Sequence, residues 1–131
     1  MEQTESQVGI HLFVYGTLMT GNGTPAVIPG KMYNIHEAFP GVKLLNNLEE
    51  GRVYGEIIFV PQHRILATDR YEGYNENNPT SSYYIRVPIT ATILEDGSEF
   101  ECNVYEFNAD ITELHPVESG KWGERSKYAR S

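Results

Sequence analysis

Residues 83–107 read YYIRVPITATILEDGSEFECNVYEF, and this stretch decides the fold class. Residues 83–93 are rich in β-branched and aromatic side chains, which is typical of a strand. Asp96-Gly97 is a preferred pair for a tight hairpin turn, and residues 99–107 alternate apolar and polar side chains after it. The segment therefore predicts a β-hairpin.

Further strands are expected on the N-terminal side of this hairpin. Residues 11–15 form a short apolar run, and residues 52–60 alternate and are β-branched, so both predict strands. Residues 32–38 and 42–45 also read as strands, with a turn expected between them at Pro40-Gly41. Most of the chain therefore builds a sheet.

Helices are expected in two places only. Residues 64–71 have helical spacing, and Gly73 is a natural end for that helix. Thr24-Pro25 can start a helix, but Pro29-Gly30 limits it to a single turn. Residues 75–82 form a polar loop long enough to act as a lid, and the chain after residue 107 is expected to be irregular. The result is an α+β fold with a curled or barrel-like sheet.

The length of 131 residues suits one domain. We expect a disordered lead over residues 1–8, a single domain over residues 9–123 and a basic tail over residues 124–131. The polar, acidic start lacks the apolar stretch of a signal peptide, and no apolar run approaches the ~20 residues of a spanning helix.

Charge and cysteine content restrict the partners and the compartment. A formal net charge of −8 argues against nucleic acid or an anionic membrane as the main partner. The single cysteine, Cys102, excludes an intrachain disulfide and indicates a reducing, cytoplasmic setting. Its place among alternating apolar residues predicts the inward face of a strand, although a reactive thiol stays an alternative.

Metal and nucleotide motifs are missing from the sequence. The four histidines are scattered at spacings that fit no local ligand motif. Gly16 and Gly21 have the spacing of a phosphate loop, but Asn22-Gly23 stands where Lys-Ser/Thr is required. We therefore expect no metal site and no nucleotide.

Tyr15-Gly16-Thr17-Leu18 is the first candidate site. It follows a predicted strand, and its backbone N–H groups, with little side-chain bulk over them, can hold an anion or a carbonyl oxygen.

Glu72 is the second candidate. It lies at the end of the predicted helix between Tyr71 and Gly73-Tyr74. An acid among aromatic side chains is poorly solvated when ionised, which raises its pKa toward that of a general base. A carboxylate at a helix end can equally remain in solvent. Asp69, earlier in the helix, is a cap or an ion-pair partner for Arg70 or Arg86.

In their order along the chain, these pieces resemble the γ-glutamylcyclotransferase-like superfamily, in particular its γ-glutamylamine cyclotransferase and AIG2-like branch. The resemblance spans residues 11–122 and depends on seven strings: Tyr15-Gly16-Thr17-Leu18 with Gly21, Phe39-Pro40-Gly41-Val42, Val53-Tyr54-Gly55-Glu56-Ile57, Thr68-Asp69-Arg70-Tyr71-Glu72-Gly73-Tyr74, Tyr84-Ile85-Arg86, Val104-Tyr105-Glu106-Phe107 and Ser119-Gly120-Lys121-Trp122. Each string alone is common, whereas all seven in order are specific.

The resemblance implies a small mixed β-barrel flanked by short helices. It implies an enzyme that releases 5-oxoproline from γ-glutamyl amines or γ-glutamyl peptides, with no metal or organic cofactor. The small γ-glutamyl molecule is then the expected partner.

The resemblance also implies roles for single residues. Tyr15, Gly16, Thr17 and Leu18 would bind the glutamyl group, largely through backbone N–H groups, and Glu72 would be the acid/base. Tyr105 would help to line the pocket, and Tyr84 and Arg86 would support it from a framework strand.

Two departures from the family pattern stand out. Only residues 19–39 separate the Tyr15–Leu18 loop from Pro40-Gly41, where the family commonly has a longer helical insertion. Lys121 replaces an acid often found before the final tryptophan. We therefore expect a pocket that is more open on one side.

Two other kinds of function stay open at the level of sequence. One is a binding module that keeps the barrel and pocket but does not turn its ligand over. The other is an adaptor that uses its acidic surface for protein contacts. Glu72 beside the Tyr15–Leu18 loop favours the enzyme, because a binder needs no base there.

Overall fold

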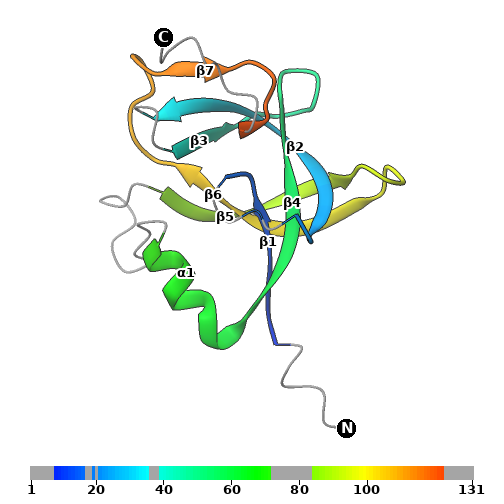
Figure 1. Ribbon diagram of the computed structural model, residues 1–131. Coiled ribbons are helices and arrows are strands. Elements are labelled where there is room, and N and C mark those ends of the chain that lie inside the picture. The colour runs from blue at the N-terminus through cyan, green and yellow to red at the C-terminus, as the bar shows by residue number, and fades with distance from the viewer. Residues whose placement is uncertain (1–7, 17–18, 20, 36–38, 72–83, 123–131) are drawn as a thin grey trace, which may run out of the picture.

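The computed structural model describes residues 8–16, 19, 21–35, 39–71 and 84–122, and within them the strands form one curved sheet (Figure 1). The strands are β1 (Gly9–Val14), β2 (Thr24–Ile35), β3 (Phe39–Leu44), β4 (Arg52–Pro61), β5 (Tyr84–Ile93), β6 (Glu99–Phe107) and β7 (His115–Val117). One turn of 3-10 helix, η2 (Gln62–Arg64), leads into the α-helix α1 (Ile65–Tyr71).

The sheet closes into a mixed barrel, as predicted. Its strands follow the order β2, β4, β1, β6 and β5, and β5 pairs back to β2 at Ala26–Ile93 and Val27–Thr92. The β1–β6 pair is parallel, whereas the other pairs are antiparallel. Among the described residues, α1 is the one α-helix beside the barrel, so the expectation of several flanking helices is met only in part.

The helical turn predicted at Thr24-Pro25 is wrong, because strand β2 begins there. Pro25 pairs with Glu56 and Pro29 with Arg52 of β4. A proline lacks an N–H to donate, and both positions tolerate this loss. Pro25 is the second residue of the strand, and Pro29 is the last one that pairs with β4.

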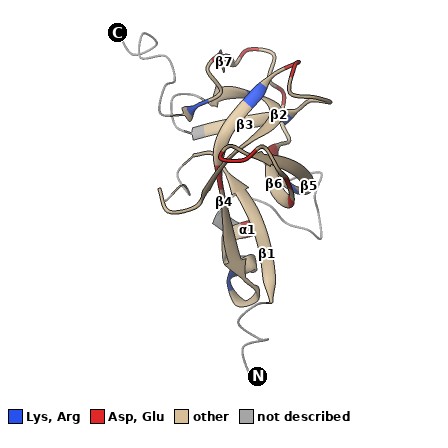
Figure 2. Cartoon of the chain, turned by 90° about the vertical axis from the view of Figure 1, so that its right-hand side faces the viewer, with Lys and Arg blue, Asp and Glu red and all other residues tan. Residues whose placement is uncertain are grey.

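The second half of β2 leaves the barrel and pairs with β3 on one side and with β7 on the other. Figures 1 and 2 show these three strands together at the end of the molecule away from α1. The strand predicted over residues 32–38 is therefore part of a longer one, and residues 36–38 lie outside the described residues. The β7 strand was not predicted.

The turn predicted at Pro40-Gly41 is also wrong, since both residues lie inside β3 and pair with β2. A Cβ atom on Gly41 would come within 2.9 Å of the Ile35 and Phe107 side chains. Glycine therefore permits close packing between β3 and the barrel here, where the sequence alone suggested a turn.

The remaining elements confirm the predictions. Strands β4, β5 and β6 and helix α1 lie where they were expected, within about one residue at their ends. The Asp96 carboxylate accepts hydrogen bonds from the Ser98 N–H (2.9 Å) and hydroxyl (2.7 Å), and Gly97 has φ of 75°. These contacts lower the pKa of Asp96 and fix the hairpin turn.

Both faces of β1 are buried in its second half, from Leu12 to Val14. Phe13 belongs to the core inside the barrel, which also contains Ile28, Val53, Cys102 and Val104. Leu12 and Val14 point the other way, into a second core on the outer side of the barrel that includes Tyr105, and Ile65 of α1 packs against it. A strand buried on both sides reads as a continuous apolar run, which explains residues 12–14, whereas His11 before them is exposed.

Near the end of the described chain, Gly120 and Lys121 contact Tyr54 of β4. The Tyr54 N–H donates to the Gly120 carbonyl (2.8 Å), and Gly120 has φ of 72°. Lys121, the departure from the family pattern, holds its Nζ 5.2 Å from the centre of the Tyr54 ring. Residues 1–7 and 123–131, with most of the predicted lead and tail, lie outside the described residues. No helix in the described part of the chain is long and apolar enough to cross a membrane.

Candidate active site

The first predicted site residue, Tyr15, directly follows β1 and is buried. Its hydroxyl donates a 2.6 Å hydrogen bond to the backbone carbonyl of Tyr105 in β6. Because β1 and β6 are parallel neighbours at Phe13–Val104, the chain leaves β1 next to Tyr105. The start of the predicted glutamyl loop is thereby fixed to the strand that carries another predicted site residue.

Gly16 is held by close packing. A Cβ atom there would lie 2.6 Å from Cγ of Pro40, so a larger residue would displace β3. The Tyr84 hydroxyl donates to the Pro40 carbonyl (2.7 Å), which joins β5 to the same point. The Gly16 carbonyl accepts from the Met19 N–H (3.0 Å), as in a tight turn.

Asp69 of α1 joins the other predicted residues. It is 3% exposed, and its carboxylate accepts from Arg86 Nε (2.9 Å) and Nη2 (3.1 Å). The Tyr105 hydroxyl donates a further hydrogen bond to the same carboxylate. Arg86 and Tyr105 are direct partners in the β5–β6 ladder, so Asp69 lies over a cross-strand pair. Two guanidinium contacts and one phenol satisfy the buried charge.

A second buried carboxylate lies on the opposite side of the loop. Glu56 of β4 is 5% exposed and pairs with Val14, the last residue of β1. Its two oxygens accept from the Gly21 N–H at 3.1 and 3.2 Å. The segment from Tyr15 to Gly21 thus begins and ends at neighbouring strands, and Gly21 supplies the φ of 83° with which the loop closes.

The structure brings five predicted site residues into one connected group, namely Tyr15, Gly16, Tyr84, Arg86 and Tyr105. Thr17, Leu18 and Glu72 lie outside the described residues, as do Gly73 and the predicted loop over residues 75–82. Glu72 follows the last residue of α1 directly in the chain. Within the described residues, no three His, Cys, Asp or Glu side chains gather to hold a metal ion.

Two residues near this group, Asp69 and Glu56, were not predicted as site residues from the sequence. Asp69 was expected as a cap or an ion-pair partner of Arg70 or Arg86, and the structure assigns it to Arg86. Glu56 was part of a family string but had no predicted role. An acid in an alternating strand resembles a solvent-facing residue, so no local signal marks it as buried.

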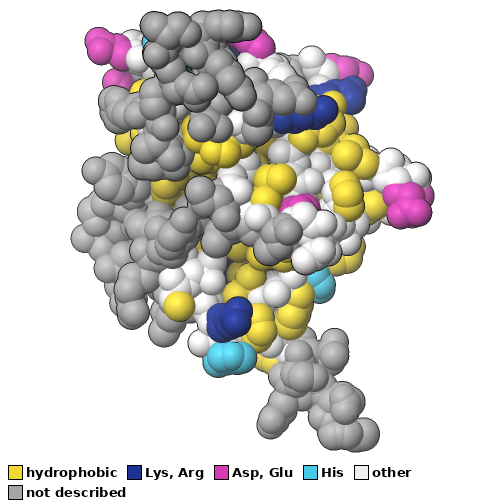
Figure 3. Space-filling view, viewed as in Figure 1, with side chains coloured by type: hydrophobic (Ala, Val, Ile, Leu, Met, Phe, Trp, Pro, Cys, Tyr) yellow, Lys and Arg dark blue, Asp and Glu magenta, His cyan; other side chains and the backbone are white. Residues whose placement is uncertain are grey.

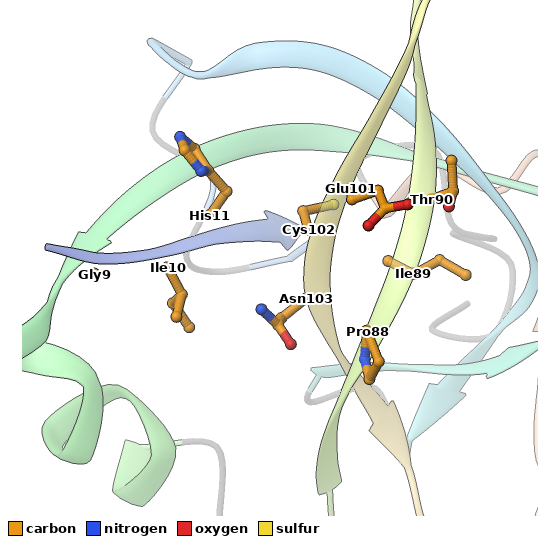
Figure 4. Close-up of a pocket in the computed structure, with 9 residues that line it drawn as sticks. All are labelled: Gly9, Ile10, His11, Pro88, Ile89, Thr90, Glu101, Cys102 and Asn103. Atoms are coloured by element: carbon orange, nitrogen blue, oxygen red, sulfur yellow. The ribbon is translucent and has the colours of Figure 1, made fainter. Parts of the chain in front are cut away.

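A separate hollow of about 600 Å³ opens at the other end of β1 (Figure 4). Residues 9–11, 88–90 and 101–103 line it, and none of the predicted site residues is among them. Its centre is about 17 Å along the strand from Tyr15, at ~3.3 Å per residue. Cys102 lines it from the core side, and burial raises the pKa of this thiol to about 11, so it stays neutral.

The described surface carries both hydrophobic and charged side chains. On the face seen in Figure 3, groups of hydrophobic side chains lie across the middle with an acidic side chain among them, and most other acidic side chains lie toward the edge. Figure 2 shows Lys and Arg as isolated segments of the described chain, with Asp and Glu spread over several turns.

Similarity to known proteins agrees with these observations. A family model described as "Gamma-glutamyl cyclotransferase, AIG2-like" matches residues 12–124, which include the loop after β1, Glu72 and Tyr105. No curated protein gives a significant sequence match.

Solved structures share the fold. A protein of Arabidopsis thaliana solved in solution has a TM-score of 0.62 at 19% identity, covering 82% of this chain and 76% of its own. An AIG2-like protein from Mus musculus has a TM-score of 0.60 at 19% identity, covering 92% of both chains. YkqA from Bacillus subtilis has a TM-score of 0.65 at 20% identity, covering 94% of this chain but 43% of its own. With the family model matching most of its length, the chain belongs to the AIG2-like γ-glutamyl cyclotransferase family.

Proposed function

We propose that the protein is a cytoplasmic cyclotransferase that releases 5-oxoproline from γ-glutamyl amines or γ-glutamyl peptides. The observation that carries the proposal is the family match over residues 12–124, which includes both the Tyr15–Leu18 loop and Glu72. The connected group of Tyr15, Tyr105, Asp69 and Arg86 supports it, because that group joins the loop to the helix that precedes Glu72.

The reaction needs no nucleophile from the protein. The α-amine of the substrate attacks its own γ-carbonyl carbon, a five-membered ring closes, and the bond from that carbon to the leaving amine breaks. Well-oriented intramolecular reactions have effective molarities up to about 10⁵–10⁸ M. Holding the glutamyl chain in a bent conformation therefore supplies a large share of the acceleration.

Glu72 is the proposed acid/base. Its carboxylate takes a proton from the α-ammonium, which makes the amine nucleophilic, and then returns that proton to the departing amine. Such proton transfer contributes about 10²–10⁴-fold. Only Arg70 and Tyr71 lie between Glu72 and the anchored Asp69 in the sequence, so the Cα atoms of Asp69 and Glu72 lie within about 11 Å of each other.

The loop after β1 is the proposed glutamyl site. Backbone N–H groups at a glycine-containing turn can donate to the carboxylate of the substrate or to the oxyanion that forms at the γ-carbon. Removing one oxyanion donor typically costs about 2.7–4 kcal/mol of transition-state stabilisation. Tyr105 and Pro40 fix the start of this loop, and Glu56 fixes its end.

The segment after the loop bears on substrate size. Where relatives commonly have a longer helical insertion, this chain forms β2, which pairs with β4 almost at once. A pocket with less cover on this side accepts larger leaving groups, so we propose that γ-glutamyl peptides as well as γ-glutamyl amines are substrates.

The test is a panel of γ-glutamyl alkylamines, γ-glutamyl dipeptides and ε-(γ-glutamyl)lysine, with 5-oxoproline measured by mass spectrometry. We expect turnover of at least one class by the wild-type protein and a loss of about 10²-fold or more in Glu72→Gln. Equal turnover by Glu72→Gln would remove Glu72 from the mechanism. No 5-oxoproline from any member would contradict the proposed activity.

A further inference from the structure

Asp69 is a buried ionisable group that the proposed reaction does not use. At 3% exposure it has no open path to a substrate, and three donor atoms already occupy its carboxylate. We propose that Asp69 is a positioning residue, which holds the helix end that leads to Glu72 in register with the glutamyl loop. The inference rests on the proposed function and adds a residue to it.

The first part of the argument is that Asp69 connects two separate parts of the site. Asp69 lies two residues before the end of α1, and its partners are Arg86 of β5 and Tyr105 of β6. The backbone carbonyl of Tyr105 in turn accepts a 2.6 Å hydrogen bond from the Tyr15 hydroxyl. Two hydrogen bonds, joined through Tyr105, therefore connect α1 to Tyr15, the first residue of the loop.

The second part is that few of the described side chains of α1 fix the helix to the barrel. It is 7 residues long, and a helix of that length is marginal without tertiary contacts. Ile65 at its beginning packs against the outer core, whereas Asp69 is the buried side chain in its last turn among those described. The ion pair therefore fixes the last turn of α1 to β5.

The third part is that the charge and shape of Asp69 both matter. Nε and Nη2 of Arg86 meet the two carboxylate oxygens as a fork, at 2.9 and 3.1 Å. An amide in Asn presents one oxygen and one N–H₂ group, so it loses one of these contacts and faces the guanidinium with a donor. Asp69→Asn keeps the side-chain volume and removes the two-point contact with Arg86, which makes it the informative variant.

The kinetic test compares Asp69→Asn in two backgrounds, wild type and Glu72→Gln. A positioning residue that acts through Glu72 lowers kcat by roughly tenfold or more in the wild type, since small misplacements of a catalytic group cost up to about 10²-fold. In the Glu72→Gln background the same substitution should change the residual kcat by less than about threefold, because the two effects are coupled. KM should change less than kcat in the wild-type background.

Two further variants serve as controls. Asp110→Asn changes an exposed carboxylate that accepts from Thr112 in a surface turn, and it should leave kcat and KM unchanged. Tyr105→Phe keeps the carbonyl that holds Tyr15 but removes the hydroxyl that donates to Asp69, and it should give an intermediate loss of kcat. If Asp69→Asn does not fold, Tyr105→Phe takes its place in both backgrounds.

A second readout does not depend on turnover. Amide hydrogen exchange should accelerate in Asp69→Asn both in α1 and at Tyr15 and Gly16, and in neither place in Asp110→Asn. Faster exchange in α1 alone would overturn the proposed link to the loop. Equal losses of kcat in both backgrounds would overturn action through Glu72. A wild-type protein that makes no 5-oxoproline contradicts the proposed function, while the exchange data still decide the link.

Discussion

At the scale of single residues, Tyr105 has two roles that the sequence could not separate. Its backbone carbonyl accepts the Tyr15 hydroxyl, and its own hydroxyl donates to Asp69. The motif order predicted Tyr15, Arg86 and Tyr105 as site residues. It did not select Arg86 over Arg70 as the partner of Asp69, because that choice depends on a contact between α1 and β5.

We expect Tyr15→Phe to lower the free energy of unfolding by about 1–3 kcal/mol, because it leaves the buried Tyr105 carbonyl without this donor. Urea unfolding followed by fluorescence measures the change. Tyr33→Phe is the matched control, since this partly buried tyrosine makes no hydrogen bond through its hydroxyl to the described residues. Equal effects of the two substitutions would show that the Tyr15 bond contributes nothing of its own.

Cys102 should be inert toward thiol reagents in the folded protein. It is 5% exposed, and burial raises its pKa to about 11, so the reactive thiolate is scarce at pH 8. We expect no labelling by a coloured disulfide reagent at pH 8 in buffer and complete labelling in concentrated urea. Rapid labelling of the native protein would contradict the inward placement of this strand face.

At the scale of elements, local sequence patterns predicted β4, β5, β6 and α1 correctly. They failed over the first part of β2 and at the start of β3, where Pro25, Pro29 and Pro40-Gly41 suggested a short helix and a turn, but they predicted strand at residues 32–35 and 42–44 correctly. In both strands the proline and glycine positions are set by what packs against them, such as Phe107 against Gly41. Local sequence contains no information on such neighbours.

Gly55 and Gly97 require glycine for two different reasons, namely close packing and a positive φ. A Cβ atom on Gly55 would lie 2.1 Å from the Val14 carbonyl oxygen, whereas Gly97 has open space and φ of 75°. We expect Gly55→Ala to cost about 3 kcal/mol or more by forcing β4 from β1, and Gly97→Ala to cost about 1 kcal/mol of backbone strain. Thermal unfolding measures both. The reverse order would contradict the β1–β4 packing.

Glu56→Gln tests the far end of the glutamyl loop. The substitution keeps the volume but removes the charge that accepts the Gly21 N–H with both oxygens. We expect KM for γ-glutamyl substrates to rise by roughly tenfold, with a smaller change in kcat, because in the proposed mechanism the loop binds the substrate and Glu72 transfers the proton. A loss confined to kcat would instead give Glu56 a part in the chemistry.

At the scale of the whole molecule, the sequence predicted a barrel-like sheet but not how it closes. Closure depends on Ala26–Ile93 and Val27–Thr92, pairs that are far apart in the chain. The Leu94 N–H adds a hydrogen bond to the Pro25 carbonyl (3.0 Å) at the same seam. Non-local pairing of this kind follows from the complete fold, as does the parallel β1–β6 contact that brings Tyr15 to Tyr105.

The central claim is that the substrate's own amine, and not water, attacks the γ-carbonyl carbon. Incubation of the wild-type protein with a substrate from the panel in H₂¹⁸O tests it most directly, with the products analysed by mass spectrometry. We predict 5-oxoproline without ¹⁸O and an equimolar amount of free amine. Glutamate containing ¹⁸O would mean that the protein is a hydrolase and would contradict the account.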